Sequence, residues 1–358
     1  MTALERKPPV AARRRGTVDG PSVTLAHGGG GQAMRDLIDD VFLEAFGAPP
    51  LAEMGDAATI ALAPLAAAGD RLAFTTDSFV VDPLFFPGGD IGKLAVCGTI
   101  NDLAVSGARP LYLTCAAIIE EGFPLAELRR VVRSMAETAR AAGVAIVAGD
   151  TKVVGRGACD KLFINTAGIG TVPAGLRLGP AEIRPGDVVL VNGLLGDHGA
   201  TILNARGDLA LTTPIESDCA ALHELIAGLL AAAPATRFLR DATRGGLAAV
   251  VNEVAEAAAL GIALEETAVP IRDEVRGFCE ILGLDPLYLA NEGRIVAIVP
   301  EAEAAAALAA LRAHPLGAAA AAIGRVTAER PGRVTMRTVL GGERVVDMLV
   351  GEQLPRIC

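Results

Sequence analysis

The sequence predicts two α/β domains, and three observations lead to this fold class. Its 358 residues are too many for one average domain and enough for two. About half of the residues (51%) are apolar, no Trp is present, and Ala, Val, Leu and Gly are abundant, which is typical of a soluble α/β protein. Short strand-like runs alternate with helical patterns along the chain.

Composition also excludes several classes of function. The formal net charge of −10 argues against non-specific binding to nucleic acid or to an anionic membrane surface. The six cysteines are dispersed without a C-x-x-C pair, so neither a zinc site nor a disulfide framework is indicated, and a reducing cytoplasmic compartment fits best. No uninterrupted apolar run is long enough to span a bilayer.

Four segments are expected along the chain. They are a disordered tail (residues 1–20), an N-terminal domain (21–175), a C-terminal domain (176–350) and a mobile C-terminal tail (351–358). The boundary near residue 175 rests on a shift in composition at Gly179-Pro180 and Arg184-Pro185-Gly186-Asp187.

In the N-terminal domain a run of glycines precedes the first helical pattern. Strands are expected at residues 59–63, 72–76, 111–119, 144–148 and 162–169, and helices at residues 35–46, 92–100 and 125–142. The glycines are Gly28, Gly29, Gly30 and Gly31. Glycine lets the backbone approach a ligand or turn freely, so this run is either an anion site beside a helix start or a flexible hinge.

Several acidic residues are expected at the ends of separate elements. Asp56 precedes the first strand, Asp77 follows the second, and Asn101 and Asp102 are expected at the exposed end of the helix that begins near Lys93. One Asp beside Gly is usually a turn residue, whereas several at the mouths of separate elements suggest oxygen ligands for a hard cation.

The string Gly149-Asp150-Thr151-Lys152 is expected at the carboxyl end of the fourth strand. It puts a carboxylate, a hydroxyl and an ammonium group within three positions. Magnesium-nucleotide chemistry needs this set, with oxygens for the metal and a cation for the phosphates. The alternative is a turn with a solvated lysine.

In the C-terminal domain strands at residues 188–192, 262–265, 295–299 and 334–339 alternate with Ala-rich helices. Three stretches there could carry chemistry: Gly196-Asp197-His198-Gly199, residues 240–246 (with Asp241, Arg244 and Gly245) and Asn291-Glu292-Gly293. The first two open helices and the third precedes a strand. His198 is either a helix-capping residue or a catalytic one.

The sequence ends on Pro355-Arg356-Ile357-Cys358. The eight residues from Gly351 span about 25 Å when extended, so the thiol of Cys358 can be carried into a cleft of the same chain. The alternative is that these residues form an ordinary frayed chain end.

Together these strings resemble the HypE family of carbamoyl dehydratases in hydrogenase maturation. This family belongs to the superfamily of aminoimidazole ribonucleotide synthetase (PurM), selenophosphate synthetase and thiamine-monophosphate kinase. The resemblance runs from about Thr24 to Cys358 and rests on Ala26-His27-Gly28, Thr76-Asp77-Ser78, Gly92-Lys93-Leu94, Gly149-Asp150-Thr151-Lys152, residues 241–246, Asn291-Glu292-Gly293 and residues 355–358. The last string separates this family from its relatives. The chain departs from the family in a longer N-terminal tail and in a single aspartate at Asp56, where relatives often have two.

The resemblance implies two PurM-like α/β domains per subunit. The N-terminal sheets of two subunits would form a shared barrel, giving a homodimer with ATP sites near the subunit boundary. A carbamoyltransferase, HypF, would attach a carbamoyl group to the sulfur of Cys358. The chain would then use ATP to dehydrate that group to a thiocyanate, and the cyano group would pass to the iron of the HypC–HypD complex for nickel-iron hydrogenase.

The resemblance also implies roles for the collected residues. The expected magnesium ligands are Asp56, Asp77, Asp102, Asp150 and Asp241. The expected ATP or phosphate contacts are Gly28, Gly29, Gly30, Gly31, Lys93, Asn101, Asp150, Thr151, Arg244 and Gly245. Cys358 would carry the substrate, Asp102 would be catalytic as well as a ligand, and Lys152 would neutralise the transferring group. Glu292 would orient the carboxamide or take its proton, with His198 as the second choice.

Two rival readings stay open. The Gly/Asp motifs alone permit a synthetase or kinase of small molecules from the same superfamily, in which Cys358 is incidental; the terminal string argues against it. A non-catalytic module that docks a partner through a disulfide at Cys358 leaves the aspartates unexplained.

Overall fold

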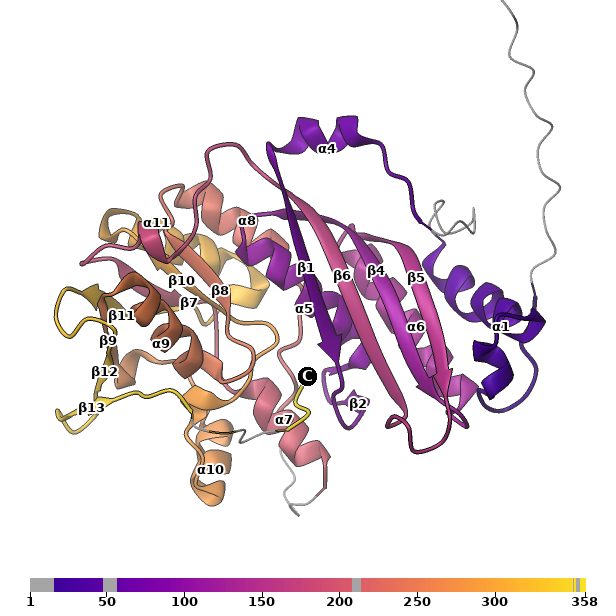
Figure 1. Cartoon of the computed structure of the whole chain (residues 1–358). Helices are drawn as coiled ribbons and strands as arrows, with labels where there is room; N and C mark the ends of the chain where they lie inside the picture. Colours follow the sequence, from indigo (N-terminus) through magenta and orange to yellow (C-terminus); the bar gives the residue numbers. More distant parts are fainter. Residues whose placement is uncertain (1–15, 48–56, 208–213, 350, 352–354) are drawn as a thin grey trace, which may run out of the picture.

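The computed structural model describes residues 16–47, 57–207, 214–349, 351 and 355–358. Two sheets with different helical covers lie side by side in it (Figure 1). The sheets use residues on either side of residue 175, where we propose the domain boundary. The predicted α/β class is confirmed.

The N-terminal half is built on a four-stranded sheet of order β1-β6-β4-β5. Its strands are β1 (Arg71–Phe79), β4 (Arg109–Glu120), β5 (Ala145–Val154) and β6 (Leu162–Val172). β4 and β5 are parallel, whereas the other two pairs are antiparallel. Helices α5 (Ile91–Val105) and α6 (Leu125–Ala141) cover one face (Figure 1).

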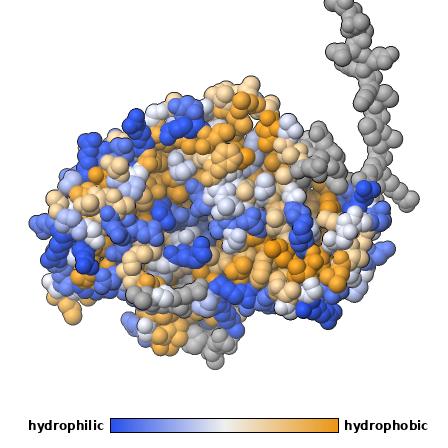
Figure 2. All heavy atoms as spheres, in the orientation of Figure 1, coloured by the Kyte–Doolittle hydropathy of each residue, from blue (hydrophilic) through white to orange (hydrophobic). Residues whose placement is uncertain are grey.

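The other face of this sheet carries exposed apolar side chains. Leu72, Phe74 and Ile118 are 45%, 70% and 41% exposed. Figure 2 shows apolar residues gathered over this region of the surface. A patch of this kind on a soluble protein marks a surface that a partner can cover.

The C-terminal half is built on a seven-stranded sheet of order β13-β12-β9-β11-β7-β10-β8. Its strands are β7 (Val188–Val191), β8 (Phe238–Asp241), β9 (Gly261–Glu265), β10 (Ile295–Val299), β11 (Ala321–Thr327), β12 (Val334–Arg337) and β13 (Glu343–Val345). The helices are α7 (Asp197–Ala205), α8 (His223–Ala232), α9 (Gly246–Ala258), α10 (Asp273–Leu282) and α11 (Glu301–Ala313).

Strand β7 is apolar at every position because it is buried on both faces. Side chains alternate between the faces of a strand. Val189 and Val191 therefore pack in one core with α9, while Val188 and Leu190 pack in another with α8 and α11. The strand predicted at residues 188–192 is confirmed as β7.

Helix α5 joins the two halves. It is apolar nearly all round, as expected of a helix with no solvent face. One side contacts β1 and β6, and another contacts α8 and β8. Asp90 caps its first turn by accepting hydrogen bonds from the N–H groups of Gly92 and Lys93 at 2.8 and 3.1 Å.

Shorter elements complete the described chain. They are η1 (Leu25–Gly28), α1 (Gln32–Leu37), η2 (Ile38–Leu43), α2 (Glu44–Phe46), α4 (Leu62–Ala68), β2 (Phe85–Phe86), β3 (Gly89–Asp90), η3 (Pro180–Glu182), η4 (Glu266–Ala268), η5 (Pro286–Tyr288) and η6 (Pro315–Gly317). No helix among the described residues has the length and apolar character that crossing a membrane requires.

The structure corrects four expectations about local structure. Residues 59–63 were expected to form a strand, but the segment is irregular until α4 begins at Leu62. α5 continues to Val105, so Asn101 and Asp102 lie within the helix and not at its exposed end. Asp150 lies inside β5, which continues to Val154. Val18, expected in a disordered tail, is buried, and its N–H donates to Asp40 Oδ2 at 2.8 Å.

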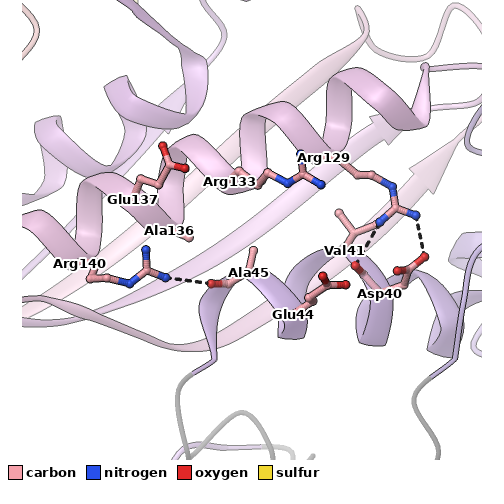
Figure 3. Close-up of a pocket in the computed structure, with 9 residues that line it drawn as sticks. All are labelled: Asp40, Val41, Glu44, Ala45, Arg129, Arg133, Ala136, Glu137 and Arg140. Carbon is pink, nitrogen blue, oxygen red and sulfur yellow. Dashed lines mark hydrogen bonds and ion pairs between the residues drawn. The ribbon is translucent and has the colours of Figure 1, made fainter.

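An ion pair fastens the N-terminal helical segment to α6. Arg129 Nη2 lies 2.6 Å from Asp40 Oδ2, and Arg140 donates to the carbonyl of Ala45 (Figure 3). The side chains of Arg129 and Asp40 are only 27% and 13% exposed. The hydrogen bond from Arg129 holds the pKa of Asp40 below its usual value.

We expect Asp40→Asn to lower the free energy of unfolding by about 1–2 kcal/mol at pH 7, since a charge-assisted bond is lost. Because the folded-state pKa of Asp40 is lowered, the stabilisation is present above the unfolded-state pKa and is lost as pH falls through the folded-state one. The difference between the variant and the wild type should therefore shrink in urea titrations at pH 3. Asp70→Asn, which breaks an exposed pair with Arg71, is the control and should cost less than about 0.5 kcal/mol. Equal losses for both variants would contradict this account.

Candidate active site

Three aspartates from three elements face one another where α5 meets β8. Asp77 lies on β1, Asp102 on α5 and Asp241 at the end of β8. Burial, together with the charges of Asp102 and Asp77, raises the pKa of Asp241 to about 7. Burial also raises the pKa values of Asp77 and Asp102, although Thr75 Oγ1 donates to Asp102 at 2.7 Å. The charges of Arg244 and Arg240 oppose these upward pKa shifts but do not cancel them.

Glu292 extends this carboxylate cluster. The residue is 3% exposed, and its Oε1 has no hydrogen-bond partner among the described residues. Burial raises the pKa of Glu292 strongly, and the charges of Asp241, Asp218 and Asp77 act in the same direction. A buried acceptor without a partner is costly unless a ligand satisfies it. Glu292 Oε1 is therefore a candidate ligand contact.

Asn291 brings the three motifs of the C-terminal half together. Its Nδ2 donates to the carbonyl of Ala242 at 2.8 Å, and its Oδ1 accepts from the N–H of Gly196 at 2.8 Å. The loops at residues 196–199, 240–246 and 291–293 thus meet at one buried amide. The sequence predicted each loop but not this connection.

Asp218 holds the loop that carries Glu292. Its carboxylate accepts from the N–H groups of Glu292 and Gly293 at 3.0 and 3.1 Å. A Cβ at Gly293 would lie 1.9 Å from the carbonyl oxygen of Asp218, so no larger residue fits.

Cys358 lies in the same site. Its carbonyl accepts from the N–H of Val80 at 3.0 Å, and Ile357 beside it is only 3% exposed. Figure 1 shows this end of the chain between the two halves. Burial raises the pKa of the Cys358 thiol to about 12, with Glu292 adding to the rise and Arg244 opposing it. The sulfur is therefore a neutral thiol at neutral pH and a poor nucleophile.

His198 holds the chain next to Cys358. Its Nε2 lies 2.8 Å from the carbonyl oxygen of Ile357, and its Nδ1 lies 2.8 Å from Ser217 Oγ. A carbonyl can only accept, so Nε2 carries the proton and Nδ1 accepts from the Ser217 hydroxyl. Burial lowers the pKa of His198, which keeps the ring neutral. Both ring nitrogens make hydrogen bonds to the protein, so His198 holds the backbone of Ile357 in place.

Two sets of residues that were predicted to bind ligands do not reach this site within one chain. They are Asp150, and Lys152 with the glycines at residues 28–31. In the register of the sheet, Asp150 is opposite Ala116, which is opposite Asn165, which is opposite Ser78. Three strand spacings put Asp150 about 14 Å from β1. Asp150 is in the row of Ser78, so it faces away from Asp77. The expected set of aspartate ligands is therefore not one cluster in a single chain.

Lys152 and the glycine run lie with Asp150 at the β5 edge. Lys152 Nζ pairs with Asp150 Oδ2 at 2.8 Å, and both side chains are more than half exposed. A Cβ at Gly28 would lie 2.9 Å from the backbone nitrogen of Val153, so η1 packs closely on β5. Gly29, Gly30 and Gly31 connect η1 to α1, and Thr151, a residue of β5, is buried. Asp56 lies outside the described residues.

The remaining predicted contacts are held by the protein itself. Lys93 Nζ donates to the carbonyl of Gly88 at 2.8 Å. Asn101 is buried, and its amide donates to the carbonyls of Ala220 and Glu292 and accepts from the N–H of Leu222. In this structure the Asn101 amide is therefore engaged by protein groups. Arg244 faces Asp77, Asp102 and Cys358, and Gly245 caps α9 with φ of +75°.

The donor set fits a hard cation in its chemistry. In the part of the chain that the structure describes, no three His, Cys, Asp or Glu side chains form a ready metal site. Asp77, Asp102 and Asp241 nevertheless offer only oxygen atoms and repel one another. A bound divalent cation would remove this repulsion.

Comparison with known proteins identifies the family. Residues 54–172 match the model of the AIR synthase related protein N-terminal domain, and residues 184–337 match that of its C-terminal domain. A relative from Rhodobacter capsulatus, carbamoyl dehydratase HypE, is 66% identical over 336 residues, which are 94% of this chain and 98% of that one. The chain belongs to the HypE family of carbamoyl dehydratases.

Solved HypE structures have the same fold. The crystal structure of the hydrogenase maturation protein HypE in complex with ATP is 50% identical and superimposes with a TM-score of 0.88, covering 94% of this chain and 99% of that one. HypE in a HypE–HypF complex is 46% identical with a TM-score of 0.76, covering 87% and 99%. The predicted family and its two PurM-like α/β domains are confirmed.

Sequence reasoning missed several residues around Cys358. Asp218, Ser217, Arg206 and Asp160 all hold the site or the segment at residues 355–358. None of them lies in a glycine-rich string or beside another motif, so no local signal distinguished them from surface residues.

We expect Gly293→Ala to destabilise the chain by more than about 2 kcal/mol, because the new methyl group would overlap the backbone of Asp218. Gly228→Ala is the matched control. Gly228 lies exposed in α8, and its Cβ would meet open space. That variant should gain up to about 1 kcal/mol from helix propensity. Thermal and urea unfolding measure both effects, and similar stabilities for the two variants would refute the close approach.

Proposed function

We propose that this chain is an ATP-dependent carbamoyl dehydratase that acts on its own Cys358. It converts an S-carbamoyl group on that sulfur to a thiocyanate and so supplies the cyanide ligand of the nickel-iron hydrogenase iron centre. The observation that carries the proposal is the position of Cys358 beside Glu292 and Asp241 in a chain of the HypE family. The ATP complex of a HypE that is 50% identical supports the use of ATP.

The chemistry requires activation of a poor leaving group. The oxygen of the carboxamide attacks the γ-phosphorus of ATP, which releases ADP, and loss of one of the two NH₂ protons gives an imidate phosphate. Cleavage of the C–O bond then releases phosphate as the N–H proton departs, which leaves the C≡N group on sulfur. The protein positions the groups and neutralises charge.

The protonation states at the site support this route. The Cys358 thiol has a pKa of about 12, so the site suits chemistry on the group that sulfur carries and not attack by a thiolate. Glu292 has a raised pKa and is therefore a stronger base than an exposed glutamate once it is ionised. Its unpartnered Oε1 is suited to accept a hydrogen bond from the carboxamide NH₂ and then its proton.

We assign Asp77, Asp102 and Asp241 as ligands of Mg²⁺, which would supply charge neutralisation for the phosphates. Asp56 stays a proposed ligand outside the described residues. Arg244 is suited to the phosphates because it already faces the carboxylate cluster. Losing such a cation should cost on the order of 10² in rate.

A homodimer accounts for the residues that do not reach the site. The apolar open face of the N-terminal sheet supports pairing of two such sheets into a shared barrel. A second copy would bring Asp150, Lys152 and the glycines at residues 28–31 towards the carboxylate cluster, where Lys152 would neutralise the transferring group. We further propose HypF as the source of the carbamoyl group, on the basis of the HypE–HypF complex, and HypC–HypD as the acceptor of cyanide.

Glu292→Gln tests the mechanism. Glutamine keeps the shape and the hydrogen bonding but cannot take the proton, so dehydration should fall by about 10²–10⁴ while ATP binding persists. Glu224→Gln, an exposed change on α8, is the control and should react at the wild-type rate. Dehydration is measured as the loss of the mass of one water from the Cys358 peptide, and ATP binding is measured by calorimetry. Wild-type turnover in Glu292→Gln would remove this residue from the mechanism.

Phe74→Glu tests the dimer. Phe74 is 70% exposed on the open sheet face, and a charge there should oppose burial in a barrel. Light scattering should then give the mass of one 36.5 kDa chain. Dehydration should also be lost, because Lys152 of the second copy would no longer reach the site. Leu340→Glu, at a 94% exposed position in the C-terminal half, should leave both unchanged. A Phe74→Glu monomer with full activity would overturn the shared site.

A further inference from the structure

The segment at residues 355–358, here called the cysteine segment, binds the chain like a short added strand. The N–H of Asp82 donates to the carbonyl of Arg356 at 3.3 Å, and the N–H of Val80 donates to the carbonyl of Cys358 at 3.0 Å. Pairing on alternate residues is the pattern of a peptide added to a strand edge. Such main-chain bonds give affinity but do not distinguish one sequence from another.

Arg206 and His198 also contact only the backbone of the cysteine segment. Arg206 Nη2 donates to the carbonyls of Pro355 and Arg356, and its Nε donates to the carbonyl of Asp82 at 3.0 Å. It thus ties α7, the β1–β2 connection and the cysteine segment together. Because these hydrogen bonds go to backbone carbonyls, they hold the segment whatever its side chains are.

The side chain of Ile357 is buried in the core of the N-terminal half, and the side chain of Arg356 makes the polar contacts that depend on sequence. Its guanidinium forms an ion pair with Asp160, donates to the carbonyl of Val80 at 2.9 Å and lies 5.9 Å from the ring centroid of Phe163. Arg356 has φ of +53°, a left-handed conformation that is unfavourable for a residue with a side chain. The surrounding contacts must hold it there. Lysine would lack the forked geometry for these partners.

We propose that Asp160 is the specificity-determining residue that reads Arg356, and that Arg206 is a positioning residue for the backbone of the cysteine segment. The inference rests on the proposed function, because it names what selects this segment as the carrier of the substrate group. Asp160 and Arg356 together set the fraction of chains in which Cys358 lies beside Glu292.

Charge exchange between Asp160 and Arg356 tests the proposal in the full chain. Asp160→Lys and Arg356→Glu each replace attraction by repulsion, whereas the double variant restores opposite charges. Both side chains are partly exposed, at 45% and 34%, so the substitutions sit at the surface of the fold. Glu280→Lys, an exposed change on α10, is the matched control for the added positive charge.

The rate of Cys358 alkylation by iodoacetamide reports docking without reference to activity. The thiol of a docked Cys358 packs against the core, and burial raises its pKa, whereas an undocked thiol is accessible and titrates at about 8.5, so at pH 8 only undocked chains react quickly. Peptide mass spectrometry separates Cys358 from the other five cysteines. Each single variant should react about three- to tenfold faster than the wild type, and Glu280→Lys should react within about twofold of it. The double variant should react more slowly than the faster single variant, because opposite charges return, although the hydrogen bond to the Val80 carbonyl does not.

Wild-type alkylation rates in both single variants, or a double variant at least as fast as the faster single one, would overturn the inference. In parallel, each S-carbamoylated single variant should be dehydrated with ATP more slowly than the wild type, in proportion to its smaller docked fraction. The alkylation pattern decides the recognition even if the wild-type chain proves unable to dehydrate, so the two proposals fail separately.

Discussion

The amide of Asn101 is the contact on which the site depends most. It projects from α5, the helix shared by the two halves, and donates to the carbonyls of Ala220 and Glu292 while accepting from the N–H of Leu222. Asn101, Glu292 and Leu222 are buried and Ala220 is partly buried, and an unsatisfied buried polar group costs about 1–3 kcal/mol. The amide therefore fixes the loop with Glu292 against the helix with Asp102. Apolar contacts of α5 alone would hold the two halves together but would not fix the position of Glu292 relative to Asp102.

The electrostatics of the site follow from that arrangement. Asp77, Asp102, Asp241 and Glu292 are brought together in a place with little water, which raises their pKa values and that of Cys358. The carboxylates therefore favour cationic ligands, and the surroundings of Cys358 favour a neutral group on its sulfur. Nucleotide phosphates would add negative charge to this cluster, so the roles that we propose for Arg244 and for a divalent cation have the same physical reason.

The elements that sequence reasoning placed correctly are those decided by local periodicity. Helix α6 has a strongly one-sided apolar pattern, and β7 and β10 are continuous apolar runs. β8 and β11 went unrecognised because β8 has only four residues, two of them charged, and β11 begins inside an alanine-rich stretch that resembles a helix. The run at residues 59–63 is apolar enough for a strand, but α4 takes its last two residues.

The motifs of the site could be found from the sequence, but their grouping could not. Asp77 and Asp150 both follow the family pattern, yet they lie on strands separated by two others and face opposite sides of the sheet. A one-residue difference in register decides the face of a strand, and local sequence does not encode it. The contacts of Arg206 and Asp160 with the cysteine segment join residues about 150 to 196 positions apart, which no local pattern reveals.

The central claim is that Cys358 carries the group that is dehydrated. Intact-protein mass spectrometry tests it most directly, after the chain is supplied with HypF, carbamoyl phosphate and ATP with Mg²⁺, and with the C-terminal peptide sequenced by fragmentation. The account predicts a carbamoyl adduct on Cys358 that loses the mass of one water only when ATP is added. An unmodified Cys358 with ATP nevertheless consumed would contradict it and favour a synthetase or kinase of small molecules.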